Sequence, residues 1–267
     1  MYGFQILCLL FLPLAYYLLY RIDRDVLFYS PIIFLAGWLG EASSIYFYDF
    51  YHYSDEWWVR VAGVPLMVPL IWPLVILSSR AVIRSLWPNL GKAMPLAVGV
   101  MVLFDAAMIE VAAVNCGLWG WAEYGYLGVP LAGIVGWAIF AVIVAAFLER
   151  LSGVQKLWTV IAAPVMLHLI LVPAWWLFLK WYLRGDWFWA FSVFTAILTL
   201  IVLLTRGRRR MGMDVAAPRL IAAGLFVVLV VVMNFTAWPV WRHILMTSVP
   251  YVLATDFQRK MLAGKPS

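Results

Sequence analysis

Three acidic residues in otherwise apolar segments are the residues of this sequence best suited to chemistry. Glu41 occurs in the second half of one such segment, and Asp105 and Glu110 both occur in a later one. Ionisable groups in apolar segments are costly and usually mark a functional site. Because no Lys or Arg lies within these segments, we expect the three carboxyl groups to spend much of their time protonated. They would then act as a proton source inside an apolar chamber.

Aromatic residues are more abundant than two interfacial belts require, with sixteen Trp, thirteen Tyr and sixteen Phe. Aromatic faces also stabilise a cation that has no counter-ion nearby. A carboxylic acid beside such faces in a dry pocket is suited to protonating an alkene and to holding the resulting carbocation. The side chains expected to contact the substrate are Trp72, Trp119, Trp121, Tyr126 and Trp137.

The tetrapeptide Gly-Val-Pro-Leu occurs twice, beginning at Gly63 and at Gly128, and each time a Trp follows nine residues after the Gly. Each copy comes after an aromatic connection, which itself follows an apolar segment with a glutamate. The proline of each copy suits the first turn of a helix, and the glycine permits a tight turn before it. We interpret the pattern as a parallel pseudo-repeat of two helices. Its copies would cover about residues 37–72 and 105–140.

Composition places these residues in a membrane. Hydrophobic residues make up 66% of the 267 residues and charged residues only 12%, which is too apolar for a soluble domain. Each membrane-spanning helix needs about 20 apolar residues, and alternating strand patterns are absent. We therefore predict an all-α, multi-pass transmembrane bundle of about eight helices. The expected segments are 3–20, 26–48, 61–78, 94–114, 129–148, 157–179, 187–205 and 220–241.

Residues 1–241 are expected to form a single transmembrane domain, and residues 242–267 a tail that lies along the membrane surface or is flexible. Lys and Arg concentrate in the odd-numbered connections, which predicts that these are cytoplasmic and that both termini lie outside. The basic residues of the tail argue the other way. The net charge of +6 does not indicate a nucleic-acid partner, because the basic stretch 206–210 is typical of a short loop near anionic lipid.

No metal site or cofactor is expected. The two cysteines, Cys8 and Cys116, lack metal-ligand spacing, and His168 has no second histidine within the apolar segments. A glycine-rich phosphate loop, a nucleophile elbow and a zinc-binding helix motif are also absent from the sequence. The chemistry would then depend on side chains alone, and the sequence leaves the oligomeric state open.

Residues 37–140 resemble the membrane carotenoid-biosynthesis family that contains the bisanhydrobacterioruberin hydratases and the carotenoid 1,2-hydratases. The residues that carry the resemblance are Glu41, VPLMVPLIW at 64–72, Asp105, Glu110, WGW at 119–121, GYLGVP at 125–130 and Gly136-Trp137. The chain departs from the family pattern at Val111, where a Pro is usual, and at Gly133-Ile134, where Asn-Phe or Asn-Tyr is common. The resemblance implies an enzyme that hydrates a long isoprenoid or carotenoid in the membrane.

Three functions remain open at this point. In the first, a protonated carboxyl group adds a proton to a terminal C=C bond, and the tertiary cation takes up water. In the second, water is excluded and another double bond captures the cation, as in membrane terpene or carotenoid cyclases. In the third, the protein is a proton-coupled transporter or a lipid-binding protein whose acids relay protons. The expected partners are a hydrophobic isoprenoid or carotenoid and the membrane lipid.

Overall fold

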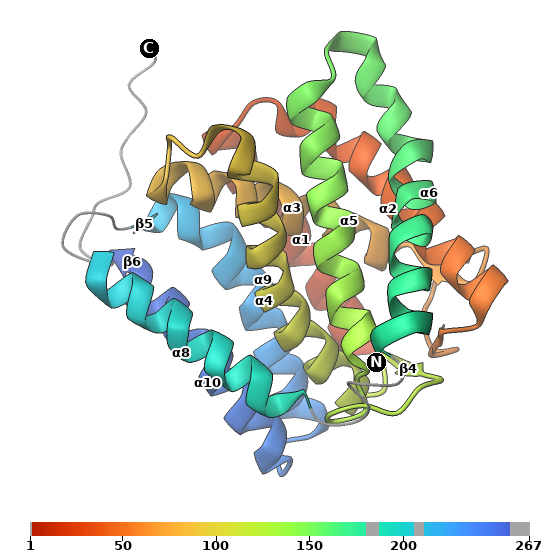
Figure 1. Cartoon of the computed structure of the whole chain (residues 1–267). Helices are drawn as coiled ribbons and strands as arrows, with labels where there is room; N and C mark the ends of the chain where they lie inside the picture. The colour runs from red at the N-terminus through yellow and green to blue at the C-terminus, as the bar shows by residue number, and fades with distance from the viewer. Residues whose placement is uncertain (1, 180–186, 206–210, 257–267) are drawn as a thin grey trace.

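The computed structural model describes residues 2–179, 187–205 and 211–256 of the chain. These residues form a bundle of long helices with short strand pairs at its two ends (Figure 1). The all-α, multi-pass architecture predicted from the sequence is confirmed. The α-helices are α1 (Tyr2–Ile22), α2 (Val26–Tyr48), α3 (Met67–Leu86), α4 (Met94–Asn115), α5 (Leu131–Arg150), α6 (Thr159–Ala174), α8 (Phe188–Thr205), α9 (Met213–Met233) and α10 (Trp238–Ala254).

Short elements complete the connections between the helices. The 3-10 helices are η1 (Gly91–Ala93) and η2 (Gly153–Trp158), and η3 (Trp175–Leu179) is a π-helix that extends α6. Antiparallel pairs form between β1 and β4 and between β2 and β3, whereas β5 and β6 pair in parallel. The strands are β1 (Tyr51–Tyr53), β2 (Arg60–Val61), β3 (Val64–Pro65), β4 (Trp119–Trp121), β5 (Met211–Gly212) and β6 (Thr255–Asp256).

In the described part of the chain, seven helical segments are long and apolar enough to cross a membrane. They comprise α1, α2, α3, α5, α9, and the continuous segments that contain α4 and α6. The seventh expected segment, 187–205, forms α8, which is apolar but shorter. The protein is therefore an integral, multi-pass membrane protein, as its composition predicts.

Two helices have bounds that differ from the expected ones. The third begins at Met67 instead of residue 61, because residues 60–65 form the β2–β3 hairpin. Helix α9 covers Met213–Met233 instead of 220–241, and Arg219 therefore lies inside it. A buried carboxylate partner on α4 stabilises this charge within the helix, so the arginine does not mark a loop.

Helix α10 lies where we expected the start of a surface tail. It packs against α4 and α8, and it buries the side chains of Val240, His243 and Thr247. Its polar residues lower its hydropathy, but several of them face the bundle. The ring Nε2 of His243, for example, lies 3.0 Å from the carbonyl oxygen of Ala107 on α4. Residues 238–254 thus belong to the helical bundle.

The two ends of the described chain lie at opposite ends of the bundle. The Gln5 amide near the start of α1 donates to the carbonyl of Glu56 in the connection between α2 and α3. The opposite end contains Met211 of β5, which packs near the C-terminal end of α3 and pairs with Thr255 of β6. This differs from the expectation that both termini lie on one side. The basic stretch 206–210 and residues 257–267 lie outside the described residues.

The predicted pseudo-repeat is visible in the backbone. Ala62 and Gly63 have φ values of 52° and 81°, and Leu127 and Gly128 have φ values of 51° and 81°. Two consecutive positive φ angles are typical of a type I′ turn, which glycine adopts without steric cost. Each turn is closed by a strand pair, Val61 with Val64 in the first copy and Tyr126 with Val129 in the second.

The two repeat prolines precede their helices and do not lie in the first helical turn as we expected. Pro65 belongs to β3, and Pro130 is the residue immediately before α5, with φ −73° and ψ 150°. A proline ring fixes φ near this value and cannot donate a hydrogen bond. Proline therefore suits the extended residue that directs the chain into each helix.

Candidate active site

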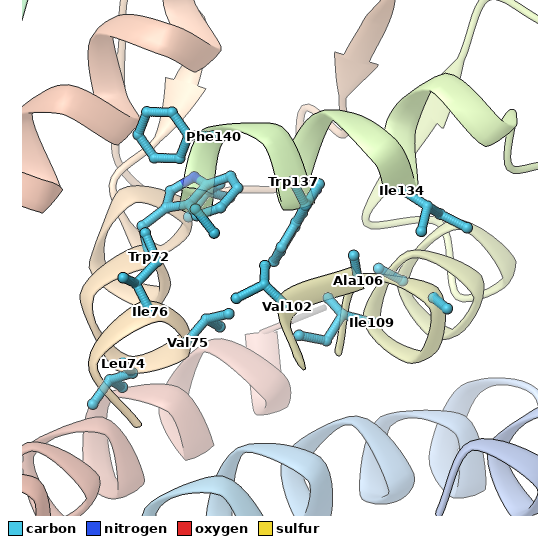
Figure 2. Close-up of a cluster of buried hydrophobic side chains, with 14 of the residues drawn as sticks. Trp72, Leu74, Val75, Ile76, Val102, Ala106, Ile109, Ile134, Trp137 and Phe140 are labelled. Atoms are coloured by element: carbon cyan, nitrogen blue, oxygen red, sulfur yellow. The ribbon is translucent and has the colours of Figure 1, made fainter. Parts of the chain in front are cut away.

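An apolar cavity with a volume of about 80 Å³ lies among the helices of the two repeat copies. We call it the acid-pair cavity, because Glu41 of α2 and Glu110 of α4 both line it. Figure 2 shows the core beside it, where Trp72 of α3 and Trp137 of α5 lie close to Phe140. Besides the two glutamates, the side chains that the site uses are Tyr51, Tyr53, Trp72, Trp119, Trp121 and Trp137.

Glu41 accepts hydrogen bonds from three neutral donors. The hydroxyl groups of Tyr51 and Tyr53 donate to its Oε2, the latter at 3.0 Å, and the indole Nε1 of Trp72 donates to its Oε1 at 3.0 Å. The two tyrosines alternate with His52 along β1, so both point to the same face of the strand. Trp72 is the tryptophan that follows the first Gly-Val-Pro-Leu stretch.

Glu110 has the same arrangement, built only from tryptophans. The Nε1 groups of Trp119 and Trp121 donate to its Oε2 at 2.8 and 2.9 Å, and Nε1 of Trp137 donates to its Oε1 at 2.9 Å. Trp119 and Trp121 alternate with Gly120 along β4, as the tyrosines do on β1. Trp137 follows the second Gly-Val-Pro-Leu stretch. Each glutamate is therefore held by two rings from a strand and one from the next helix.

Aromatic rings of one copy contact aromatic rings of the other. Their centroids lie 4.8 Å apart for Tyr51 and Trp121, 5.8 Å apart for Tyr53 and Trp119, and 4.4 Å apart for Trp72 and Trp137. The β1–β4 ladder brings the first two pairs together, because its register places Tyr51 opposite Trp121 and Tyr53 opposite Trp119. Such rings contribute dispersion and electrostatic contacts, and here they join the two carboxyl sites into one assembly.

Neither carboxyl group of the acid-pair cavity has a basic partner. Among the described residues that line the cavity there is no Lys, Arg or His. Glu41 is 9% exposed and Glu110 is 2% exposed, so water screens neither group well. Within the described residues, no group of three or more His, Cys, Asp and Glu side chains is placed to hold a metal ion. The site can thus offer two uncompensated carboxyl groups to an apolar ligand.

Asp105 differs from the two glutamates in place and in charge pairing. Its Oδ1 accepts hydrogen bonds from the guanidinium of Arg219 and, at 2.8 Å, from the hydroxyl of Tyr251. The expectation that no basic residue neutralises the three acids is therefore wrong for Asp105. Asp105 lines a second cavity, and it is absent from the lining of the acid-pair cavity. Arg219 was missed because the sequence places it in a basic connection and not in a helix.

The other predicted site residues divide in a similar way. The four predicted tryptophans all line the acid-pair cavity, whereas Tyr126 does not. The Tyr126 ring instead contacts Trp187 and Phe188 near the start of α8. A further acid that the sequence did not single out, Glu123, also lines the cavity and accepts a 2.7 Å hydrogen bond from Nε1 of Trp175.

Tyr51 and Tyr53 are the main site residues that the sequence did not single out. Burial and the adjacent Glu41 carboxyl raise the pKa of both tyrosines well above its usual value. Both hydroxyl groups therefore remain protonated donors at neutral pH. Their spacing after Glu41 is close to that of Trp119 and Trp121 after Glu110, and this similarity between the copies was the available signal.

Gly37 on α2 tests whether the position of Trp72 matters. A Cβ at Gly37 would lie 2.6 Å from Cδ1 of Trp72, so Gly37→Ala must displace the indole that donates to Glu41. We expect this variant to lose most of its activity and to change the tryptophan fluorescence. Gly224→Ala on α9 is the matched control, since a Cβ there would have no heavy atom within 4 Å. Equal activity of the two variants would contradict the assigned role of Trp72.

Comparison with known proteins yields one match. A family profile described as "Carotenoid biosynthesis protein" matches residues 3–205, which is about three quarters of the 267 residues. Searches of the curated proteins and of the solved structures returned no match. The matched residues contain Glu41, Glu110 and all six of their aromatic donors, but neither Arg219 nor Tyr251. The chain belongs to the carotenoid biosynthesis protein family.

Proposed function

We propose that this carotenoid-biosynthesis membrane protein is an enzyme that adds a proton, and then water, to a terminal C=C bond of an isoprenoid or carotenoid. One observation supports this most directly. Two carboxyl groups without basic partners line the same aromatic cavity, and each is held by three neutral donors. General acids and bases of this type accelerate proton transfer to and from carbon-based substrates without a cofactor.

Glu110 is the proposed proton donor. Its three partners are indole N–H groups, which donate hydrogen bonds but cannot accept them. A proton on Glu110 therefore has no acceptor among these partners and is available to a substrate in the cavity. Once the proton has left, the same three N–H groups stabilise the carboxylate that remains. The tryptophan cage thus favours the state after proton transfer.

Glu41 is the proposed base. Once Glu41 has taken up a proton, its O–H group can donate a hydrogen bond to Tyr51 or Tyr53, because a tyrosine hydroxyl accepts hydrogen bonds as well as donating them. The Glu110 O–H bond breaks as a C–H bond forms at the less substituted alkene carbon, and a tertiary carbocation results. A water oxygen then forms the C–O bond, and Glu41 takes the proton that this water releases. The net change is the addition of one water, and transfer of a proton from Glu41 back to Glu110 restores the enzyme.

The rings around the cavity support the cationic intermediate in this scheme. Trp72 and Trp137, whose ring planes are inclined by 38°, both line the cavity that contains the two acids. Indole faces are the strongest cation–π partners among side chains and contribute about 2 kcal/mol or more when desolvated. Because no basic side chain lines the described part of this cavity, the cation would meet no electrostatic repulsion.

The test is expression of the protein in a host that makes a linear carotenoid, followed by mass analysis of the lipid extract. Hydration predicts a product heavier than its precursor by one water. Cyclisation by the same carbocation would give a product of unchanged mass. This result would assign the protein as a cyclase and not as a hydratase. No new product from any linear carotenoid or polyprenyl chain would contradict both enzyme assignments.

The role of the Trp137 indole N–H can be tested separately from that of its ring. Trp137→Phe keeps a ring against Trp72 but removes one of the three donors to Glu110. Because a hydrogen bond to a charged group contributes about 1.5–3 kcal/mol, we expect the rate to fall by about tenfold to a hundredfold. Trp158→Phe is the control, since Trp158 is 67% exposed. A rate unchanged by Trp137→Phe would show that this donor does not stabilise the Glu110 carboxylate.

A further inference from the structure

A second apolar cavity, with a volume of about 180 Å³, lies beside the acid-pair cavity. It is bordered by parts of α1, α3, α4, α9 and α10, and Asp105 and Arg219 line it. Ile71 and Ile109 line both cavities, and Figure 2 shows Ile109 on α4 within the hydrophobic core. The second cavity therefore adjoins the proposed catalytic site but has its own polar group.

That polar group is an ion pair fixed by further hydrogen bonds. The Arg219 guanidinium donates to the hydroxyl groups of Ser78 and Ser79 at 3.1 and 2.7 Å, and to Tyr251 at 2.6 Å. It also bonds Oδ1 of Asp105, which Tyr251 contacts as well. The Arg219 side chain is 9% exposed and that of Asp105 is 14% exposed. The five residues thus hold both charged groups in a single orientation.

Two buried atoms of this ion pair have no hydrogen-bond partner among the residues that the structure describes, Oδ2 of Asp105 and Nε of Arg219. An unsatisfied buried donor or acceptor costs about 1–3 kcal/mol, and more for charged groups. One atom is an acceptor and the other is a donor, and the pair as a whole is neutral. An alcohol has this combination, because its O–H donates while its oxygen accepts.

The opposite charges of Asp105 and Arg219 and the apolar lining of the second cavity restrict the ligand further. An anionic head group would meet the Asp105 carboxylate, and a cationic one would meet Arg219, so each adds a repulsion. Most of the remaining lining is apolar and includes Leu74, Phe104 and Phe226, which suits a hydrocarbon chain better than a cluster of waters. We propose that the second cavity binds a neutral, hydroxyl-bearing chain molecule whose hydroxyl group bonds Asp105 and Arg219.

The experiment uses the full chain in lipid nanodiscs and a photoreactive analogue of geranylgeraniol. Crosslinks should map to peptides of α9 and α10 that line the second cavity. Geranylgeraniol should compete about tenfold better than the hydrocarbon of the same chain, since one hydrogen bond to a charged group is worth about a factor of ten or more. Octadecanol and a diacylglycerol are parallel competitors, and their ranking distinguishes an isoprenoid alcohol from an acyl lipid as the source.

The variants make the result specific to the ion pair. Asp105→Asn combined with Arg219→Gln removes both charges together and should abolish the preference for the alcohol. The matched control is Asp55→Asn combined with Arg60→Gln. It neutralises an exposed ion pair outside the cavity, in which a guanidinium nitrogen of Arg60 lies 2.7 Å from Oδ1 of Asp55. That control should retain the preference. Equal competition by alcohol and hydrocarbon in the unaltered protein, or a preference that survives the Asp105–Arg219 double variant, would overturn the proposal.

A third variant decides the question if the Asp105–Arg219 double variant does not fold. Ala223→Leu adds bulk to the lining of the second cavity and leaves Asp105 and Arg219 unsubstituted. It should reduce crosslinking by the geranylgeraniol analogue several-fold, and unchanged crosslinking would overturn the proposal. Binding is measured without turnover, so this result is independent of whether the acid-pair cavity catalyses hydration.

Discussion

Glu110→Gln is expected to lower the rate of product formation by a factor of about a hundred to ten thousand, the usual contribution of a general acid. Glutamine has nearly the shape of glutamate but cannot release a proton to an alkene. Its amide oxygen can still accept indole N–H bonds, whereas its NH2 group would face at least one indole N–H, so part of the cage around position 110 should stay in place. The loss should therefore appear in turnover and not in substrate binding, and single-turnover analysis of the extracted product separates the two.

Glu56→Gln is the matched control for this prediction. Glu56 is an exposed glutamate in the connection between α2 and α3, at the same end of the bundle as the acid-pair cavity. It should keep the activity of the unaltered protein. If Glu110→Gln also kept that activity, Glu110 would not be the proton donor, and Glu41 and Glu123 would be the remaining acids of the cavity.

Arg219→Met is expected to destabilise the folded bundle by about 3–5 kcal/mol, because it leaves the buried Asp105 carboxyl without its cation. Arg219 links α9 to α3 through Ser78 and Ser79 and to α4 through Asp105. The free energy of unfolding can be measured by titrating the detergent-solubilised protein with SDS. Since the variant removes no group from the acid-pair cavity, the protein that remains folded should still catalyse the reaction.

The double variant Asp105→Asn with Arg219→Gln tests the cause of this loss. It removes both charges and leaves neutral polar side chains, so it should be more stable than Arg219→Met alone. If both proteins lost the same free energy of unfolding, the stabilisation would come from packing of the Arg219 stem and not from the ion pair.

Much of the acid-pair cavity could be predicted because the sequence pattern that forms each half of it occurs twice. Glu41 and Glu110, with Trp72 and Trp137 at the same offset after Gly-Val-Pro-Leu, identify equivalent positions in two copies. Helices α2 to α5 then place these positions together, because both copies cross the membrane in the same direction. Composition alone was sufficient for the helical bundle, since only helices satisfy the backbone in an apolar chain of this kind.

The partner of Asp105 could not be predicted from local pattern. Arg219 is distant in the sequence and stands in a stretch whose other basic residues indicate a loop. Only the packing of α9 against α3 and α4 reveals the ion pair. Helix α10 was obscured for a related reason, because His243 and Tyr251 reduce its hydropathy although they bond residues of α4.

Tyr126 shows the limit of a motif as a guide to position. It stands one residue before the turn of the second copy, and its ring contacts Trp187 and Phe188 at the start of α8. The first copy has Val61 at the equivalent position, so no aromatic ring is repeated there. A position at which the two copies differ was therefore a weaker candidate than those at which both retain a hydrogen-bond donor.

Turnover in heavy water tests the central claim most directly, because proton transfer to carbon is common to hydration and cyclisation. The reconstituted protein is given a linear carotenoid in D2O, and deuterium in the product is located by mass spectrometry and NMR. We expect one carbon-bound deuterium at the less substituted carbon of the former double bond with the unaltered protein, and at most about a hundredth as much product from Glu110→Gln. A product without carbon-bound deuterium would contradict alkene protonation by the acid pair.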